Sequence, residues 1–339
     1  MSGRSTGGIR VPQRLSRLRR PMTAGLVGLA VAVSAGCGSD TAPVAPATQG
    51  TYVEPPLPSG AVPAQTQTPP PPVNDSCGDP TASLRPNGIK SGPDIDAIRA
   101  RGRLLVGLDP GSNLFSFRDP TTGMLTGFDV DIARELARDL LGNPDSIEYR
   151  ILGSADREQA LQEHTVDVVV KTMTINCDRR QRVTFSTSYL QSHQRLLVVK
   201  DSGIGTLADL AGKRVCVVPG TTSLDLVRRE QPAASILTVP SWADCLVVLQ
   251  QRQVEAVSTD DTLLAGLAVQ DPATAVAGPN LDTEQYGIGI SKGSDDLVRF
   301  VNGTLERIRS DGTWNRLYNR WLAGELGDAA IPPPPKYQD

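Results

Sequence analysis

The sequence has almost no histidine and lacks the motifs on which common hydrolases and metal sites depend. Only His164 and His193 are present, and neither a G-x-S-x-G nor an H-E-x-x-H pattern occurs in the 339 residues. No C-x-x-C pair occurs among the five cysteines, so neither a redox dithiol nor a zinc site is indicated. We therefore expect a protein that is not an enzyme and that holds no metal or other cofactor.

Long apolar runs are scarce as well, and the only prominent one lies near the N-terminus. It extends from Met22 to Gly36 and follows six arginines with no acidic residue among them. A basic segment, a short apolar segment and a small-residue cleavage site are typical of a secretory signal peptide. The run is shorter than the roughly 20 apolar residues that a membrane-spanning helix needs. We predict that residues 1–36 are a signal peptide.

The end of this run resembles a bacterial lipobox, in which the cysteine is lipid-modified and becomes the mature N-terminus. The segment is Ser34-Ala35-Gly36-Cys37, and it departs from the usual pattern at Ser34, where Leu, Val or Ile is more common. The resemblance implies a lipid anchor at Cys37 and a location on the outer face of the cytoplasmic membrane. An ordinary signal peptide that happens to end near a cysteine is the alternative.

Basic residues are in short supply once the signal peptide is removed. The Lys and Arg count falls from 34 to 28 against 37 acidic residues, which gives a net charge of −9. This balance argues against nucleic acid or an anionic lipid surface as a partner. Only the local charge of a site then decides which ligand is attracted, because salt screens fields over roughly 8 Å.

Residues 37–80 have the composition of a linker. Ten prolines lie between Pro43 and Pro72, mixed with Ala, Thr, Gln and Ser. Such a stretch cannot bury a core and favours an extended polyproline conformation. We expect a spacer between the anchor and the folded body. Pro332 to Pro335 end the chain in a similar way, so residues 329–339 are expected to form a flexible tail.

Strands and helices alternate along residues 80–328, which predicts an α/β fold with parallel sheets. Ile132, Leu136 and Leu140 share one face of a helix that begins near Phe128, with Asp129 as its expected N-cap. Further elements are expected at residues 103–107, 166–172, 214–218, 224–229, 235–239, 242–251 and 254–259. Two more strands, at residues 194–200 and 286–291, flank the second block of this pattern. Their crossings predict two lobes joined by a two-strand hinge, with residues 80–195 and 286–328 in lobe 1 and residues 196–285 in lobe 2.

The four remaining cysteines fit an oxidising compartment. Cys216 lies on an expected strand and Cys245 on the helix of the same unit, and closing that interval would stabilise the fold by about 3–4 kcal/mol on the chain-entropy model. Cys77 precedes the core and Cys177 follows a strand, so pairing them would hold the end of the linker against the first lobe. Four cysteines allow three connectivities, and the sequence alone does not choose among them.

Seven segments, in order and in register, resemble the polar amino-acid-binding proteins of ABC importers. The resemblance extends over residues 100–325. The segments are Gly127-Phe128-Asp129-Val130-Asp131, Thr172 to Ser186 with Arg179, Leu207 to Lys213, Gly220 to Ser223, Thr259 to Asp261, Gln285 to Ile288, and Asp311 to Trp314.

This resemblance implies a bilobal fold of the type II periplasmic-binding-protein kind, most similar to the glutamate- and glutamine-binding branch. It implies a monomer that closes around one polar amino acid and presents it to an ABC-importer permease. Cys216 with Cys245 is similar to a pair found in actinobacterial glutamate-binding relatives.

The main charges of an α-amino acid have candidate partners in these segments. Arg179 can bind the α-carboxylate through two parallel hydrogen bonds. Gly220, Thr221 and Thr222 precede a helix, whose free N–H groups favour the same anion. Asp260 ends a strand and can accept the ammonium group. Thr172 and Thr174 alternate on an expected strand and so point to one face.

Three further residues are candidates for reading the ligand's side chain. Asp109 and Arg157 match a pocket acid and a side-chain-binding arginine of the resembling family, and Lys171 directly precedes Thr172. With two cations facing one carboxylate, the pocket would prefer glutamate or aspartate. If Lys171 points away, the set is neutral, and glutamine or asparagine would suit equally well. Ser112 and Ser154 replace the family's usual aromatic clamps, which favours a polar ligand.

Three other functions fit parts of the sequence. The protein could be the ligand-binding subunit of a transmembrane amino-acid sensor, because sensing and import use the same closed shape. It could be a dehydratase- or transglycosylase-like enzyme of the same fold, for which Asp109 is the unassigned acid. It could also be a structural protein of the cell wall. The ability to bind an amino acid without converting it would argue against the last two.

Overall fold

The computed structural model describes residues 53–63, 70, 72–327 and 331–338. The predicted signal peptide and the lipidation site at Cys37 lie outside these residues, as do parts of the predicted linker. Residues from Val53 onward form one compact unit. Among the described residues, no helix is both long enough and apolar enough to cross a membrane.

Lobe 1 is built on a five-stranded sheet in the order β5-β1-β6-β14-β7. Its strands are β1 (Leu104–Leu108), β5 (Ile147–Ile151), β6 (Val168–Val169), β7 (Val183–Phe185) and β14 (Gly289–Ser291). Its helices are α1 (Pro93–Arg101), α2 (Phe128–Leu141), α3 (Arg157–Gln162), α4 (Cys177–Arg180), α8 (Asp295–Ser310), α9 (Thr313–Trp321) and α10 (Ala323–Leu326). A small sheet of β2 (Gly111–Ser112), β3 (Ser116–Arg118) and β4 (Leu125–Thr126) adjoins it. The apolar face expected for α2 is buried, and Gly142 ends this helix in a left-handed conformation.

Lobe 2 is built on a second sheet in the order β10-β9-β11-β8-β12. Its strands are β8 (Leu190–Val199), β9 (Arg214–Val217), β10 (Ser235–Thr238), β11 (Ala256–Asp260) and β12 (Thr274–Ala277). Its helices are the 3-10 turn η1 (Leu207–Leu210), α5 (Thr222–Glu230), α6 (Trp242–Gln250) and α7 (Asp261–Gln270). The Thr221 and Ser241 hydroxyls accept hydrogen bonds from the first turns of α5 and α6, which fixes where these helices begin.

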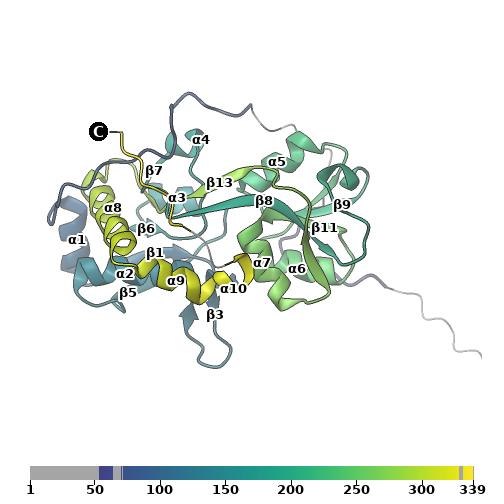
Figure 1. Ribbon diagram of the computed structural model, residues 1–339, viewed down its shortest axis with the longest axis horizontal. Coiled ribbons are helices and arrows are strands. Elements are labelled where there is room, and N and C mark those ends of the chain that lie inside the picture. The colour runs from purple at the N-terminus through teal and green to yellow at the C-terminus, as the bar shows by residue number, and fades with distance from the viewer. Residues whose placement is uncertain (1–52, 64–69, 71, 328–330, 339) are drawn as a thin grey trace, which may run out of the picture. The chain divides into compact units, whose positions relative to one another are not determined.

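Two antiparallel strands connect the lobes. The first residues of β8 pair with β13 (Thr283–Tyr286), and the rest of β8 pairs with β11 and β12 in the sheet of lobe 2. In Figure 1, β8 extends from the elements of lobe 1 to those of lobe 2, with β13 beside it. The predicted bilobal α/β fold with a two-strand hinge is confirmed, whereas the assigned residue boundaries of the lobes stay a prediction.

Three structural expectations were wrong in detail. Both sheets are mixed, because β14 runs antiparallel to its neighbours and β8 enters its sheet from the hinge, without a crossover helix. The strand expected at residues 166–172 is limited to β6, and Thr172 has a left-handed φ of 39° that no continuing strand can adopt. Asp129 lies inside α2, whose N-cap is Gly127.

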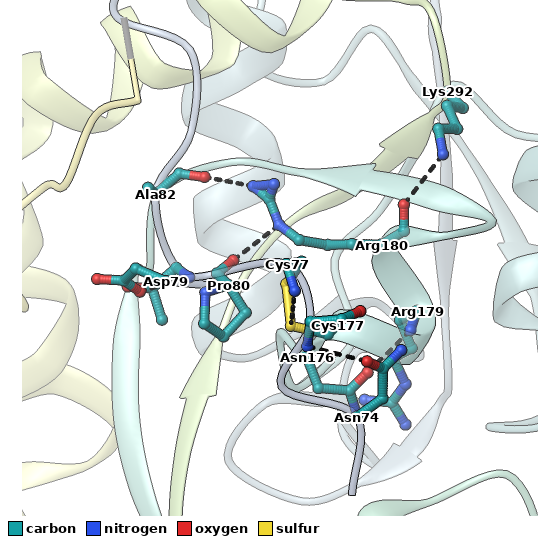
Figure 2. The surroundings of a disulfide bond; sticks show 12 residues. Asn74, Cys77, Asp79, Pro80, Ala82, Asn176, Cys177, Arg179, Arg180 and Lys292 are labelled. Carbon is teal, nitrogen blue, oxygen red and sulfur yellow. Dashed lines mark hydrogen bonds between the residues drawn. A yellow bond between two sulfur atoms is a disulfide. The ribbon is translucent and has the colours of Figure 1, made fainter.

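The described parts of the predicted linker and tail contact the folded body. Val62 exchanges backbone hydrogen bonds with Thr238 of β10, at 2.8 and 3.1 Å. Cys77 forms a disulfide with Cys177 of α4, and the Arg180 side chain donates to the carbonyls of Pro80 and Ala82 (Figure 2). The second disulfide joins Cys216 to Cys245, so the two bridges are those considered from the sequence. At the other end of the chain, Tyr337 forms a β-bridge with Ser83.

Candidate functional site

Seven of the ten predicted ligand-binding residues line one small cavity between the lobes. Its lining is Ser154, Arg157, Thr172, Thr174, Arg179, Thr221, Thr222, Ser223, Trp242, Thr259, Asp260 and Leu263. The lobes approach so closely that the remaining volume is about 10 Å³, on the scale of a single water molecule. A larger ligand therefore has to displace contacts between the lobes.

Arg179 is the third residue of α4 and points into this cavity. The Asn176 side chain accepts from the Arg179 backbone N–H at 2.9 Å and so fixes the start of the short helix. One guanidinium nitrogen donates to the Thr174 carbonyl at 2.7 Å, and the other donates to the Gly220 carbonyl of lobe 2 at 3.0 Å. Glu158 lies 3.5 Å from Nε. Burial lowers the pKa of Arg179.

Arg157 opens α3 and lies beside Arg179. Its guanidinium donates to the carbonyls of Ser154 at 2.9 Å, Lys171 at 3.1 Å and, across the cleft, Gly220 at 3.1 Å. Burial, and then repulsion by Arg179, lower the pKa of Arg157 to about 9. Two buried arginines of lobe 1 thus share one backbone carbonyl of lobe 2, an arrangement in which a ligand carboxylate can replace the carbonyl.

Lobe 2 supplies an anion and a helix N-terminus on the opposite wall. Asp260 ends β11, where one carboxylate oxygen accepts from the Tyr286 hydroxyl and the other, Oδ1, is buried without a hydrogen-bond partner. Burial, followed by the charge of Glu284, raises the pKa of Asp260 well above its usual value. Thr222 opens α5, and its hydroxyl lies 3.5 Å from that of Thr174 in lobe 1.

Asp109 and Lys171 do not line the cavity. The Lys171 ammonium lies 3.5 Å from an Asp109 carboxylate oxygen and donates to the Leu152 carbonyl at 2.9 Å and to the Ser154 hydroxyl at 3.2 Å. Burial lowers the pKa of Lys171 to about 8 against the opposing effect of Asp109. The charges of this pair offset each other behind Ser154, which does line the cavity. Gly220 contributes through its carbonyl to the two arginines.

Asp129 does not line the cavity but binds residues that position it, a role that the sequence interpretation missed. Its fully buried carboxylate accepts from the Thr172 backbone N–H at 3.1 Å and from the Tyr189 hydroxyl at 2.8 Å. The first bond holds the Thr172 backbone at its left-handed position, and the second fixes the carboxylate. Burial raises the pKa of Asp129 to about 7, although both hydrogen bonds act in the opposite direction.

Four lining residues were not predicted, namely Ser223, Trp242, Thr259 and Leu263. Trp242 follows β10 and begins α6, so it lies at the carboxyl end of a strand, where ligand residues gather in α/β sheets. That signal was available in the sequence. Nothing comparable marks Leu263, which is an ordinary apolar residue of α7.

The cavity carries groups that match both charges of a zwitterion. Its lining contains two guanidinium groups, one carboxylate and six hydroxyl side chains besides Ser154. Among the described residues, no group of three His, Cys, Asp or Glu side chains is arranged to hold a metal ion.

The chain is similar to known proteins along most of its folded part. The model of the bacterial extracellular solute-binding proteins, family 3, matches residues 104–324. The ABC transporter glutamine-binding protein GlnH of Bacillus subtilis is 33% identical over 229 residues, which cover 67% of this chain and 84% of that protein. The glutamate-binding protein GluB of Corynebacterium glutamicum is 33% identical over 258 residues, which cover 72% of this chain and 85% of that protein. The solved structure of a solute receptor for L-cysteine from Neisseria gonorrhoeae matches with a TM-score of 0.66 and 28% identity, over 69% of this chain and 95% of that one.

Proposed function

The chain belongs to family 3 of the bacterial extracellular solute-binding proteins, and on that premise we propose that it binds one acidic amino acid between its lobes and delivers it to an ABC importer. The observation that carries the proposal is the pairing of Arg179 with Asp260 across one cavity. A guanidinium on one wall and a carboxylate with a free oxygen on the other match the two charges of an α-amino acid.

In the proposed complex, the ligand's α-carboxylate takes the place of the Gly220 carbonyl in front of Arg179. The hydroxyl of Thr174 and the first N–H groups of α5 add further donors to the same anion. The ammonium group donates to Asp260 Oδ1, the buried acceptor that otherwise has no partner. Because these groups come from both lobes, the ligand stabilises the closed arrangement.

The charge of the lining supports an acidic side chain on the ligand. Arg157 and Arg179 outnumber Asp260, while Lys171 is offset by Asp109 outside the cavity. An amino acid with a neutral side chain has no net charge, so it leaves the one surplus positive charge of the lining unbalanced. Glutamate or aspartate supplies one further carboxylate in its side chain. Arg157 is then the residue that binds this second carboxylate. Glutamine or asparagine would leave the Arg157 guanidinium without this second carboxylate in the cavity, which is costly in a buried site.

A competition experiment tests the preference. We expect glutamate or aspartate to raise the melting temperature in a screen of the twenty amino acids, because a ligand at 100 times its dissociation constant adds about 2.7 kcal/mol of stability. In calorimetric competition, the acid should bind at least about tenfold more tightly than its amide. Displacement of glutamate by an equal concentration of glutamine would remove the acidic assignment, and failure to bind any amino acid would remove the function.

We further propose that the protein transports its ligand without converting it. An enzyme of this fold would need a cleft acid that the ligand's ammonium group does not engage, and the unassigned candidate was Asp109. That carboxylate accepts from the Gly111 backbone N–H at 2.8 Å and lies beside Lys171, away from the cavity lining. Recovery of the bound amino acid unchanged after prolonged incubation is the expected result.

A lipid anchor at Cys37 completes the proposal and places the protein at the outer face of the cytoplasmic membrane. Its support is the sequence of the N-terminal segment, which lies outside the described residues. Replacing Cys37 by Ala should move the protein from the membrane fraction to the soluble fraction. A single acyl chain gives only marginal binding, so the parent is expected to carry more than one. Equal recovery of parent and variant in membranes would contradict the anchor.

A further inference from the structure

A second and larger cavity lies next to the hinge, beside the proposed amino-acid site. Its volume is about 190 Å³, and it shares Thr174 and Thr222 with the first cavity. The hydroxyls of these two residues are 3.5 Å apart, so they form part of the wall between the cavities. Lobe 1 contributes α4, lobe 2 contributes α5, and the two hinge strands contribute Gln194 and Glu284.

The N-terminal segment forms one side of this hinge cavity. Pro72, Val73 and Asn74 line it a few residues before the disulfide that joins Cys77 to Cys177. In Figure 2, this segment runs past α4, with Asn74 next to Asn176, and both residues line the cavity. The cavity is therefore lined by five parts of the chain that are distant in sequence.

Acidic side chains dominate the lining of the hinge cavity. It contains four carboxylates, and its single cation is Arg229, which is exposed and donates to Glu230 at 2.9 Å. The carboxylates are Asp178, Asp225, Asp282 and Glu284. Asp225 is half-exposed, and Arg228 lies 3.9 Å from it, at the limit of an ion pair.

Two buried oxygen atoms in this lining have no hydrogen-bond donor. The side chains of Gln194 and Glu284 are 1% and 2% exposed, and the Gln194 amide nitrogen donates to one Glu284 oxygen. Gln194 Oε1 and Glu284 Oε2 remain without partners. Glu284 lies two residues before Tyr286 on β13, so both side chains lie on the face that carries the Tyr286 contact to Asp260. A buried acceptor without a donor is costly, and each such group calls for an explanation.

We propose that the hinge cavity binds a small organic ammonium ion, such as an aliphatic amine or diamine, between the two lobes. An ammonium group supplies up to three donors, which matches the two buried acceptors without partners, Gln194 Oε1 and Glu284 Oε2. Its charge offsets the surplus of carboxylates. The described residues contain no three-ligand metal site, and the cavity is much larger than one bare ion needs. The inference goes beyond the proposed transport of an amino acid.

An ammonium ion in this position would also strengthen lobe closure. Asp178 belongs to lobe 1 and Asp225 to lobe 2, so closure brings their like charges into one cavity. A cation between them removes that repulsion only in the closed arrangement. The amine and the amino acid should therefore raise each other's affinity by the same factor, as linkage requires.

Calorimetry with butane-1,4-diamine at low ionic strength tests the site on the mature chain. We expect binding of one diamine per chain. The Asp225→Asn and Glu284→Gln variants should each bind it at least about tenfold more weakly, because each loses a charged acceptor. Asp201→Asn is the matched control, since it removes the same charge from an exposed turn outside the cavity and should bind the diamine normally.

Competition experiments distinguish specific binding of an ammonium group from nonspecific attraction of any cation. Ammonium and methylammonium chloride should compete with the diamine, whereas potassium chloride at equal ionic strength should not. No binding at millimolar diamine, equal binding by all three variants, or displacement by potassium as effective as by ammonium would each overturn the inference. Amino-acid affinity, measured without amine, reports on the proposed function separately. Circular dichroism of Asp225→Asn checks that substitution of this half-exposed residue leaves the fold intact.

Discussion

At the scale of single residues, the shape of the proposed amino-acid site depends on a carboxyl group that does not line it. Asp129 is bound to the Thr172 backbone N–H and the Tyr189 hydroxyl, and Thr172 has a φ of 39°. A β-branched residue adopts this conformation only when its surroundings impose it. The carbonyls of Lys171 and Thr172 are thereby directed at Arg157.

Replacing Asp129 by Asn should change the pH dependence of stability. Burial raises the pKa of the folded-state carboxyl from 3.8 to about 7, so between these values the folded protein keeps a proton that the unfolded chain has lost. The contribution of this group to the free energy of unfolding is thus greatest below pH 4 and falls as the pH rises to 7. The difference between parent and variant in urea denaturation should shrink over that range. A constant difference would mean that Asp129 titrates normally.

Replacing Arg179 by Ala should lower amino-acid affinity by roughly 10²- to 10⁴-fold, because a buried carboxylate loses its main partner. Stability should fall as well, since the Thr174 and Gly220 carbonyls each lose a donor. Arg180→Ala is the control, because this neighbour on α4 faces the N-terminal segment (Figure 2). Less than a tenfold loss of affinity by calorimetry would exclude Arg179 from the site.

The sequence predicted the cavity residues that carry a recognisable chemistry and missed those defined by packing. Arg179 and Asp260 could be found because charge and motif mark them. Lys171 could not be placed, because the strand on which its orientation was argued ends before it. Leu263 has no polar group, so only the closed arrangement of the lobes brings it to the site.

At the scale of elements, the two disulfides hold different segments. The Cys216–Cys245 bridge joins β9 to α6 within one lobe, whereas the Cys77–Cys177 bridge joins α4 to the segment that precedes the fold. Replacing both members of either pair by Ser should lower stability by about 3–5 kcal/mol on the chain-entropy model. Urea denaturation measures this loss.

Limited proteolysis should then distinguish the two bridges. Only the variant without Cys77 and Cys177 should become cleavable between residues 72 and 82, because its segment is then held by non-covalent contacts, namely those of Arg180 with the Pro80 and Ala82 carbonyls and of Lys336 with Asp79. The variant without Cys216 and Cys245 serves as the control of similar destabilisation. Cleavage at that segment in both variants would mean that global unfolding, and not local release, exposes it.

Most elements could be predicted because their apolar patterns are regular, while strand direction could not. The face of Ile132, Leu136 and Leu140 repeats every four residues and is buried as expected. The direction of a strand depends on the connection that leads into it. The chain enters β8 directly from the hinge and not through a crossover helix, so β8 runs antiparallel to β11. Alternation of strands and helices alone does not contain that information.

At the scale of the whole molecule, Gly220 decides whether the lobes can close. A Cβ atom at this position would lie 2.5 Å from the Ala155 Cα of the other lobe. We expect Gly220→Ala to bind the amino acid at least about tenfold more weakly and, at saturating ligand, to show a larger radius of gyration by X-ray scattering than the parent.

Gly203→Ala is the matched control for this variant. Gly203 has a φ of 75°, against 72° at Gly220, so both substitutions carry a similar backbone strain, but no atom lies within 4 Å of the added Cβ at Gly203. This control should bind and close normally. If the two variants behave alike, backbone strain and not the contact between lobes explains the effect.

The division of the site between two lobes makes recognition conditional on both halves at once. Arg179 of α4 lies on one wall and Asp260 of β11 on the other, and the strands β8 and β13 connect the two lobes. A dicarboxylic acid without an amine can bind only the arginine wall, and an amine without a carboxylate can bind only Asp260. In both cases the opposite lobe forms no contact with the ligand. Such a partial ligand lacks one set of contacts, and it also lacks the stabilisation of the closed arrangement that those contacts would provide. Under the proposed function, a tight complex therefore requires the carboxylate and the ammonium group together, and the losses in affinity caused by two partial matches multiply.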